Sequence, residues 1–310
     1  MSATGVRGKP WVDLQVNGYA GVDFNADELT VEEVLAVCRR LEDDSVRGIL
    51  ATIITAPLDQ MLHRISRLAR WIDQVPEVAE KLHGIHVEGP FISAVSGYVG
   101  AHPVAAVLPA SREAASRLVE AGGGQVRLVT LAPEADPGFQ VTRALAEQGI
   151  LVAAGHSDAS RDQLRGAIDA GLRLYTHLGN GCPGMMHRHD NIIQRVLSLA
   201  DSLAISFIAD GHHVPPFALK NYLSLVPDEH IVIVSDAISA AGLGPGEFQL
   251  GSQTVYVDQA GAAWSADRTH FAGSAATLLK MRAVLDELGY SADQINRWMG
   301  TNPARLINAA

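Results

Sequence analysis

Ionisable side chains stand at the ends of several short apolar runs in this sequence. The stretch IHVEGP (85 to 90) carries a histidine and a glutamate two residues apart and then stops at Gly-Pro. Because side chains alternate along a strand, His86 and Glu88 share one face, and we expect both to face the mouth of the fold. Similar runs end in GHSD with His156, in THLGN with His177 and in SDA with Asp236.

These residue types suit metal-assisted hydrolysis. Two imidazoles and one carboxylate, with one position left for water, form the ligand set of a catalytic zinc-type site. We therefore interpret Glu88, His156 and His177 as ligands of one divalent ion. Asp236 could accept the proton of an attacking water whose pKa the ion lowers, and return it to a leaving group. Each residue alone could be a hydrogen-bonded structural group or a loop cap, but the set of four favours a site.

The elements that must position these residues follow a regular alternation. Apolar runs rich in β-branched residues alternate with segments of helical period, and each run precedes a helix candidate. Helix starts are indicated near Thr30, where Thr30 and Glu33 can form a capping box, and near Ser111, Ser160 and Pro215. The eight runs cover residues 11 to 16, 48 to 55, 81 to 87, 126 to 132, 150 to 155, 172 to 177, 203 to 209 and 230 to 236.

Eight such pairs predict an α/β fold of the (β/α)8 TIM-barrel type, in which the active site lies at the C-terminal ends of the strands. An open doubly wound sheet is the alternative. Residues 247 to 264 alternate like a β-hairpin, with turns at Gly251-Ser252 and at Gln259 to Gly261, and we interpret them as an excursion between the eighth strand and the last helix. In the absence of repeats or long linkers, residues 1–310 are predicted to form one domain.

Composition limits the partners. The 310 residues carry a formal charge of -10, with 34 acidic against 24 basic residues and no basic run, which argues against nucleic acid and anionic lipid. Two cysteines are too few for a disulfide framework. The N-terminus lacks the apolar region of a signal peptide, and no run approaches the ~20 apolar residues of a membrane span. We expect an acidic, cytoplasmic protein with a small-molecule partner and no membrane contact.

Several stretches taken together resemble one family, the N-acetylglucosamine-6-phosphate deacetylases of the amidohydrolase superfamily. The likeness runs in order over nearly the whole chain, to TNPARLI at 301 to 307. The stretches are DLQVNGYAGVDFN (13 to 25), HVEGPFIS (86 to 93), GAHP (100 to 103), GHSDAS (155 to 160), THLGNGCPGMMHR (176 to 188), IADGHHV (208 to 214), VSDAISAAG (234 to 242) and FAGSA (271 to 275).

The resemblance implies deacetylation of N-acetylglucosamine 6-phosphate to glucosamine 6-phosphate and acetate. It makes Glu88, His156 and His177 the metal ligands and Asp236 the general acid/base. Many amidohydrolases carry a further metal-binding HxH on the first strand, but here the matching positions hold Gln15 and Asn17. Amides are poor ligands beside imidazole, so one ion per subunit is expected, zinc first, with iron or another borderline ion as alternatives.

The resemblance also implies a substrate-binding set. His102 would meet a sugar hydroxyl, the Asn180-Gly181 turn would meet the phosphate, and Arg188 and His213 would be the cationic partners of that phosphate. In the family a neighbouring subunit supplies part of this contact, which implies a homodimer. The remaining wall of the substrate site would include Gln15, Ala272 and Gly273.

Three departures from the family pattern leave alternatives open. Family members usually carry a small β-sandwich, for which this sequence leaves no room, so the barrel is expected to stand alone. The stretches LGNGC (178 to 182) and HRHDN (187 to 191) also differ from the usual ones. The alternatives are a deacylase of another N-acyl amine or amino sugar, and a catalytically silent sugar-phosphate-binding barrel. A Schiff-base aldolase is disfavoured because no run ends in lysine, and Cys182 suggests a tight turn rather than a nucleophile.

Overall fold

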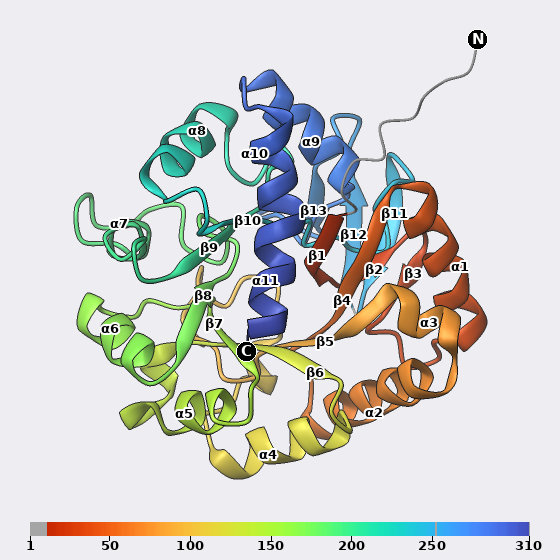
Figure 1. The fold of residues 1–310 in the computed structure, drawn as a ribbon, viewed down its shortest axis with the longest axis horizontal. Helices are drawn as coiled ribbons and strands as arrows, with labels where there is room; N and C mark the ends of the chain where they lie inside the picture. The colour runs from red at the N-terminus through yellow and green to blue at the C-terminus, as the bar shows by residue number, and fades with distance from the viewer. Residues whose placement is uncertain (1–10, 252, 310) are drawn as a thin grey trace.

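The protein was analysed as a computed structural model that describes residues 11–251 and 253–309. Eight parallel strands form one sheet in the order β1-β4-β5-β6-β7-β8-β9-β10, and in Figure 1 they surround a common centre. This confirms the predicted TIM barrel over the open sheet. The strands are β1 (Trp11–Val16), β4 (Val46–Ile54), β5 (Leu82–Glu88), β6 (Val126–Leu131), β7 (Leu151–Ala154), β8 (Leu172–Tyr175), β9 (Ala204–Phe207) and β10 (Ile231–Ile233).

The barrel closes between its first and last strands through a few specific contacts instead of a full ladder. Val16 and Ala237 form an isolated parallel bridge. The backbone N–H of Asn17 donates to the carbonyl of Ala237 at 2.7 Å. The Asp13 carboxylate accepts from the backbone N–H of Ser235 at 3.1 and 3.2 Å. Residues from the two ends of the chain therefore meet at this seam, directly below Asp236.

The helices lie around the outside of the strands in Figure 1, and the last helix passes in front of the centre of the barrel, where it contacts β1 and β10. All four predicted helix starts are confirmed: Thr30 and Ser160 form capping boxes, Ser111 caps through its side chain, and Pro215 precedes a helix. The helices are α1 (Val31–Asp43), α2 (Leu58–Gln74), α3 (Pro76–Lys81), α4 (Arg112–Ala121), α5 (Gln140–Ala146), α6 (Arg161–Asp169), α7 (Ile192–Leu197), α8 (Pro216–Leu225), α9 (Leu278–Glu287), α10 (Ala292–Asn296) and α11 (Asn302–Ala309).

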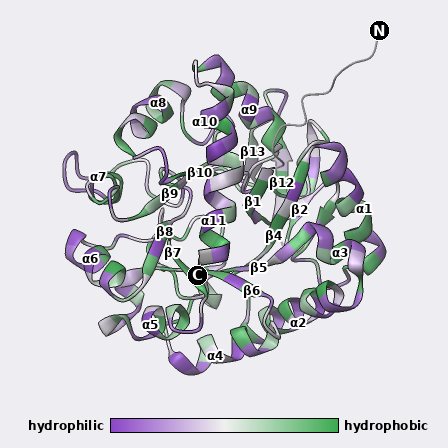
Figure 2. Ribbon diagram, viewed as in Figure 1, coloured by the Kyte–Doolittle hydropathy of each residue, from purple (hydrophilic) through white to green (hydrophobic). Residues whose placement is uncertain are grey.

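The core follows the periodicity of these elements. Hydrophobic and hydrophilic residues are interspersed along each outer helix in Figure 2, as expected for amphipathic helices. In α1 the buried residues are Val34, Val37, Cys38 and Leu41. Short helical turns η1 (Val104–Ala106), η2 (Pro133–Ala135) and η3 (Pro137–Phe139) and the π-helical turn η4 (Arg297–Thr301) complete the connections. In the described part of the chain, no helix combines the length and apolar character that a membrane crossing needs.

The segment expected to form a hairpin contains three antiparallel strands: β11 (Gly246–Leu250), β12 (Gln253–Val257) and β13 (Ala263–Ser265). The third strand arises because the turn at Asp258 to Gly261 brings the chain back along β12. This sheet packs Leu250, Val255 and Val257 against Ile54 and Ile238 near the strand ends of the barrel. A short pair, β2 (Gly18–Tyr19) and β3 (Val22–Asp23), was not expected. The N-terminal residues 1–10, on which the signal-peptide prediction rests, and the turn residue 252 lie outside the described residues.

Candidate active site

Three side chains from separate strands converge at the C-terminal end of the barrel. Glu88 is the last residue of β5, and its Oε1 lies 2.9 Å from Nε2 of His177 and 3.3 Å from Nε2 of His156. The ligand atoms of the three residues all lie within 4.8 Å of one another, and all three residues are buried. The structure therefore brings together the ligand set that the sequence suggested.

An uncommon backbone conformation aims the two histidines and the aspartate. His156, His177 and Asp236 have φ of 50°, 34° and 50°, in the left-handed region that non-glycine residues rarely adopt. The sequence placed His177 and Asp236 at the ends of strands, but β8 ends at Tyr175 and β10 at Ile233. Such strain costs on the order of 1–3 kcal/mol per residue and persists where the surroundings over-determine it, commonly at functional sites.

Hydrogen bonds fix the imidazole of His156 and the backbone of His177. Nδ1 of His156 lies 2.9 Å from the carbonyl of Tyr98, so this nitrogen carries the proton and Nε2 is left with a lone pair. The backbone N–H of His177 donates to Ser206 at 2.8 Å, which holds that turn. Gly181 (φ 59°) packs on the His156 ring so closely that a Cβ would lie 2.9 Å from Nδ1. Only glycine leaves room for the imidazole there.

The electrostatics of the cluster suit a cation. Burial opposes ionisation of Glu88, but hydrogen bonds from His156 and His177 outweigh it and hold the Glu88 pKa well below its usual value. Burial disfavours the charged form of His156, yet the hydrogen bond and charge of Glu88 raise the His156 pKa overall. The carboxylate thus recruits positive charge to this point, and a divalent ion between the three ligand atoms would supply it in place of a proton.

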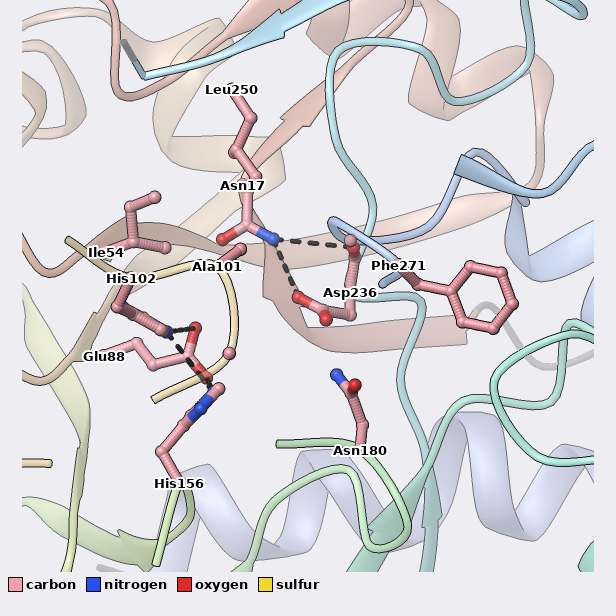
Figure 3. Close-up of a pocket in the computed structure, with 12 residues that line it drawn as sticks. Asn17, Ile54, Glu88, Ala101, His102, His156, Asn180, Asp236, Leu250 and Phe271 are labelled. Carbon is pink, nitrogen blue, oxygen red and sulfur yellow. Dashed lines mark hydrogen bonds and ion pairs between the residues drawn. The ribbon is translucent and has the colours of Figure 1, made fainter. Parts of the chain in front are cut away.

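His102 lies at the edge of the same cluster. Its Nε2 is 3.3 Å from Nε2 of His156 and 3.9 Å from Oε2 of Glu88, and its Nδ1 has no partner among the described residues. Burial lowers the pKa of His102 to about 3, so the ring is neutral. In Figure 3 Glu88, His102 and His156 point toward one another, and Asp236 faces them from the other side.

Asp236 is held by two amides of β1 and the residue after it. Its Oδ1 accepts from Nδ2 of Asn17 at 2.8 Å and from Nε2 of Gln15 at 3.2 Å. The same Gln15 nitrogen donates to Oε1 of Glu88 at 2.9 Å, and Thr176 donates to Oε1 of Gln15 at 2.6 Å, which sets the amide orientation. Burial and then the charge of Glu88 raise the pKa of Asp236, which suits a carboxylate that must accept a proton.

A cavity of about 40 Å³ separates the two sides of the site. Small-molecule sites commonly measure about 300–1,000 Å³, so this cavity alone encloses only a small part of such a ligand. Part of the wall belongs to the β11–β13 sheet and to the loop before His102. The lining residues are Asn17, Ile54, Glu88, Gly100, Ala101, His102, His156, Asn180, Asp236, Leu250, Phe271 and Gly273.

The other residues of the expected substrate set take varied positions. Ala272 is fully buried beside Gly273, and Gln15 touches both Glu88 and Asp236 without lining the cavity. His213 lies behind Phe271, with ring centroids 5.1 Å apart. Arg188 is exposed on the loop between β8 and α7, outside the cavity lining. The structure does not bring Arg188 into the site of its own chain.

One expectation is wrong and one residue was missed. His86 does not face the mouth: it is buried in the barrel interior, 3.3 Å from Oγ1 of Thr52 and 2.8 Å from Oγ1 of Thr130, because two residues along a strand is about 6.6 Å of depth. Asp210, which holds His213, was not singled out. It directly follows the predicted run 203 to 209, so the rule that identified the other strand-end residues would have found it.

The barrel and its Glu-His-His cluster define a (β/α)8 enzyme of the metal-dependent amidohydrolase type. No family model matches the sequence. The N-acetylglucosamine-6-phosphate deacetylases of Bos taurus and Homo sapiens are each 34% identical to this chain, over 96% of the chain and 73% of the relative. The N-acetylgalactosamine-6-phosphate deacetylase of Escherichia coli O157:H7 is 31% identical, over 96% of the chain and 77% of the relative.

Solved structures agree with these relatives. An aspartate-to-alanine mutant of N-acetyl-D-glucosamine-6-phosphate deacetylase from Mycobacterium smegmatis, in complex with N-acetyl-D-glucosamine-6-phosphate, is 29% identical with a TM-score of 0.85, covering 97% of this chain and 77% of that one. The deacetylase from Thermotoga maritima is 26% identical with a TM-score of 0.83, covering 97% and 78%. The chain belongs to the N-acetylglucosamine-6-phosphate deacetylase family.

Proposed function

We propose that this chain removes the acetyl group from N-acetylglucosamine 6-phosphate, giving glucosamine 6-phosphate and acetate. The observation that carries the proposal is the convergence of Glu88, His156 and His177 opposite Asp236, in a chain of this family. A hydrolase of an unreactive amide needs a polarised carbonyl, an activated water and a proton for the leaving nitrogen. The ion-binding residues would serve the carbonyl and the water, and Asp236 on the opposite side of the cavity would serve the leaving nitrogen.

One divalent ion would be held by Oε1 of Glu88 and the Nε2 atoms of His156 and His177. Zinc suits this donor set best, and iron or another borderline ion is the alternative. When bound, the ion supplies a Lewis acid that polarises the acetamide carbonyl and lowers the pKa of a water. Gln15 and Asn17 stand where a second ion would need imidazoles, which favours a single ion per chain.

Asp236 carries the proton. Its Oδ1 is occupied by the two amide donors, whereas its Oδ2 receives no hydrogen bond within the described residues. Oδ2 takes the proton of the attacking water and then delivers it to the amide nitrogen, so that the C–N bond breaks with loss of a neutral amine. Gln15 and Asn17 keep the carboxylate aimed at the cavity through both transfers, and neutral His102 orients the sugar beside the acetamide.

The phosphate would be held at the opposite wall. Asn180 and Gly181 offer a turn, His213 offers an imidazole, and Arg188 a guanidinium. Because Arg188 is exposed outside the cavity of its own chain, we propose that it serves the site of a second copy in a homodimer. We also propose that residues 1–310 form one domain. The chain is proposed to be cytoplasmic, in keeping with the two free cysteines Cys38 and Cys182.

The test combines elemental analysis of the purified chain with an acetate-release assay. We expect about one equivalent of a divalent ion per chain and turnover of N-acetylglucosamine 6-phosphate. The galacto isomer belongs in the same assay because one relative is named for it. Faster turnover of another N-acyl amine would reassign the substrate. Tight binding of the sugar phosphate without turnover under any divalent ion would replace the enzyme with a binding barrel.

A further inference from the structure

The imidazole of His213, part of the proposed phosphate wall, is paired with a buried carboxylate, Asp210, that the mechanism above does not use. Asp210 follows β9, and its Oδ2 lies 2.7 Å from Nδ1 of His213. Its Oδ1 accepts the backbone N–H groups of His212 and His213 at 2.8 and 3.0 Å, and Oδ2 also accepts the Ser274 hydroxyl at 3.1 Å. The side chains of Asp210 and His213 are only 3% and 2% exposed. The carboxylate is therefore locked in place from three directions.

This contact sets the charge of the imidazole. Burial opposes ionisation of Asp210, but the charge and hydrogen bond of His213 outweigh it and lower the Asp210 pKa to about 2. Burial likewise disfavours a charged His213, yet Asp210, followed by the more distant Asp236, raises the His213 pKa above its usual value. These two carboxylates are the charged groups that act on the ring, and both favour its imidazolium form.

The other side of the ring lacks a partner. With Nδ1 donating to Asp210, the remaining N–H of His213 is at Nε2, which is buried without a hydrogen bond among the described residues. Phe271 packs against the ring and itself lines the cavity, so His213 lies one side chain behind this part of the cavity wall. A buried cationic donor that the described residues leave unsatisfied points to an anionic group of a ligand.

We propose that Asp210 is a positioning residue that holds His213 as a cation, with Nε2–H presented to the phosphate of the substrate. The proposal rests on the proposed function for the phosphate role of His213 and adds the residue that gives it charge and direction. Asp210 could otherwise be only a cap for the turn after β9, since it accepts two backbone N–H groups there. A cap alone would affect folding, but not the charge or direction of the imidazole.

Asp210→Asn separates these roles. The amide oxygen can still accept the backbone N–H groups, while the amide nitrogen would donate to Nδ1, so His213 would keep its Nε2–H but become neutral. We expect KM for N-acetylglucosamine 6-phosphate at neutral pH to rise about ten- to hundredfold, the size of one charge-assisted hydrogen bond, with a far smaller change in kcat. This rise in KM should be at least about tenfold greater than the rise in KM that Asp210→Asn causes for unphosphorylated N-acetylglucosamine.

The pH profile and a double mutant sharpen the test. Because Asp210 raises the pKa of His213, the wild-type imidazole stays charged to higher pH. As the pH is increased, KM should therefore begin to rise at a lower pH in Asp210→Asn than in the wild type. In a His213→Gln background, Asp210→Asn should add nothing, because the residues act as one unit. Asp136→Asn is the matched control: this aspartate is equally buried and accepts the backbone N–H groups of Val141 and Thr142, but contacts no histidine.

The proposed role of Asp210 would be overturned if Asp210→Asn raised KM equally for the phosphorylated and unphosphorylated sugars. It would also be overturned if the effects of the two substitutions on KM added in the double mutant. An unchanged pH profile in Asp210→Asn would do the same. If the wild-type chain hydrolyses neither sugar, the proposed function fails, while calorimetric titration of wild type and variants with glucosamine 6-phosphate still tests the Asp210–His213 pair by the same criteria.

Discussion

Replacing Asp236 with asparagine tests the proton-transfer assignment with little disturbance of the fold. Asn17 and Gln15 both donate to Oδ1 of Asp236, and the carbonyl oxygen of an asparagine can accept both bonds in the same geometry. The replacement also removes a buried negative charge close to Glu88, whose field raises the pKa of Asp236. We therefore expect the variant to fold at least as stably as the wild type and to keep its divalent ion.

The expected loss lies in kcat. Asparagine cannot accept the proton of the attacking water or return it to nitrogen, and a positioned general acid/base contributes typically about 10²- to 10⁴-fold. This corresponds to about 3–5 kcal/mol in the activation barrier. KM should change by no more than a few-fold, because we assign Oδ2 to proton transfer and propose that the phosphate binds at the other wall.

The assay is acetate release from N-acetylglucosamine 6-phosphate, with the ion content of each preparation measured alongside. Urea unfolding of the Asp236→Asn variant and the wild type provides the folding control. If the variant retained more than about a tenth of the wild-type kcat with its ion bound, the assignment of Asp236 as the acid/base would be wrong. If the Asp236→Asn variant were purified without its ion, Asp236 would instead be assigned as one of the metal ligands.

Three further predictions follow from other contacts. Removing the ion with a chelator should abolish turnover and lower the thermal midpoint, and adding zinc should restore both. The reason is that an ion at a hundred times its Kd adds about 2.7 kcal/mol to the free energy of unfolding. In Glu88→Gln, which lacks one ligand, the chelator should shift the midpoint much less. Mixed dimers of Arg188→Ala with Asp236→Asn should recover one working site, whereas activity no greater than that of the separate variants would refute the shared site. Because the Asp210 pKa is lowered from 3.8 to about 2 and that of His213 is raised, their pairing stabilises the fold by about 2 kcal/mol. This contribution to the free energy of unfolding should be fully present between about pH 4 and 6.5 and should decline at lower and at higher pH. Urea unfolding should therefore show a larger stability difference between the wild type and Asp210→Asn at pH 5 than at pH 3.

The barrel could be predicted because its signals are local. Each strand is a short apolar run, each helix begins at a residue with capping chemistry, and eight pairs leave few topologies. The rule that chemistry lies at the C-terminal strand ends then brought Glu88, His156, His177 and Asp236 into one neighbourhood without any distance information. Asp210 fits the same rule, since it directly follows the run 203 to 209, but the sequence interpretation did not include it.

The geometry of the site could not be predicted because contacts distant in sequence set it. The left-handed conformations at His156, His177 and Asp236 contradict local preference, which would continue the strands or open a turn at glycine. They are held by partners elsewhere in the chain, such as Tyr98 for His156 and Asn17 for Asp236. The depth of His86 likewise depends on the strand register, which the sequence of one strand does not contain.

Closure of the barrel and assembly of the site depend on the same side chains of β1. Asp13 accepts from the backbone N–H of Ser235, Asn17 donates to Asp236, and Gln15 joins Asp236 to Glu88. The residues joined across the seam are separated by more than 200 positions, so these bonds form only when the first and last strands meet. The carboxylate of Asp236, which we propose as the acid/base, is therefore in place only in the closed barrel, because the contacts that align it are those that hold the seam together.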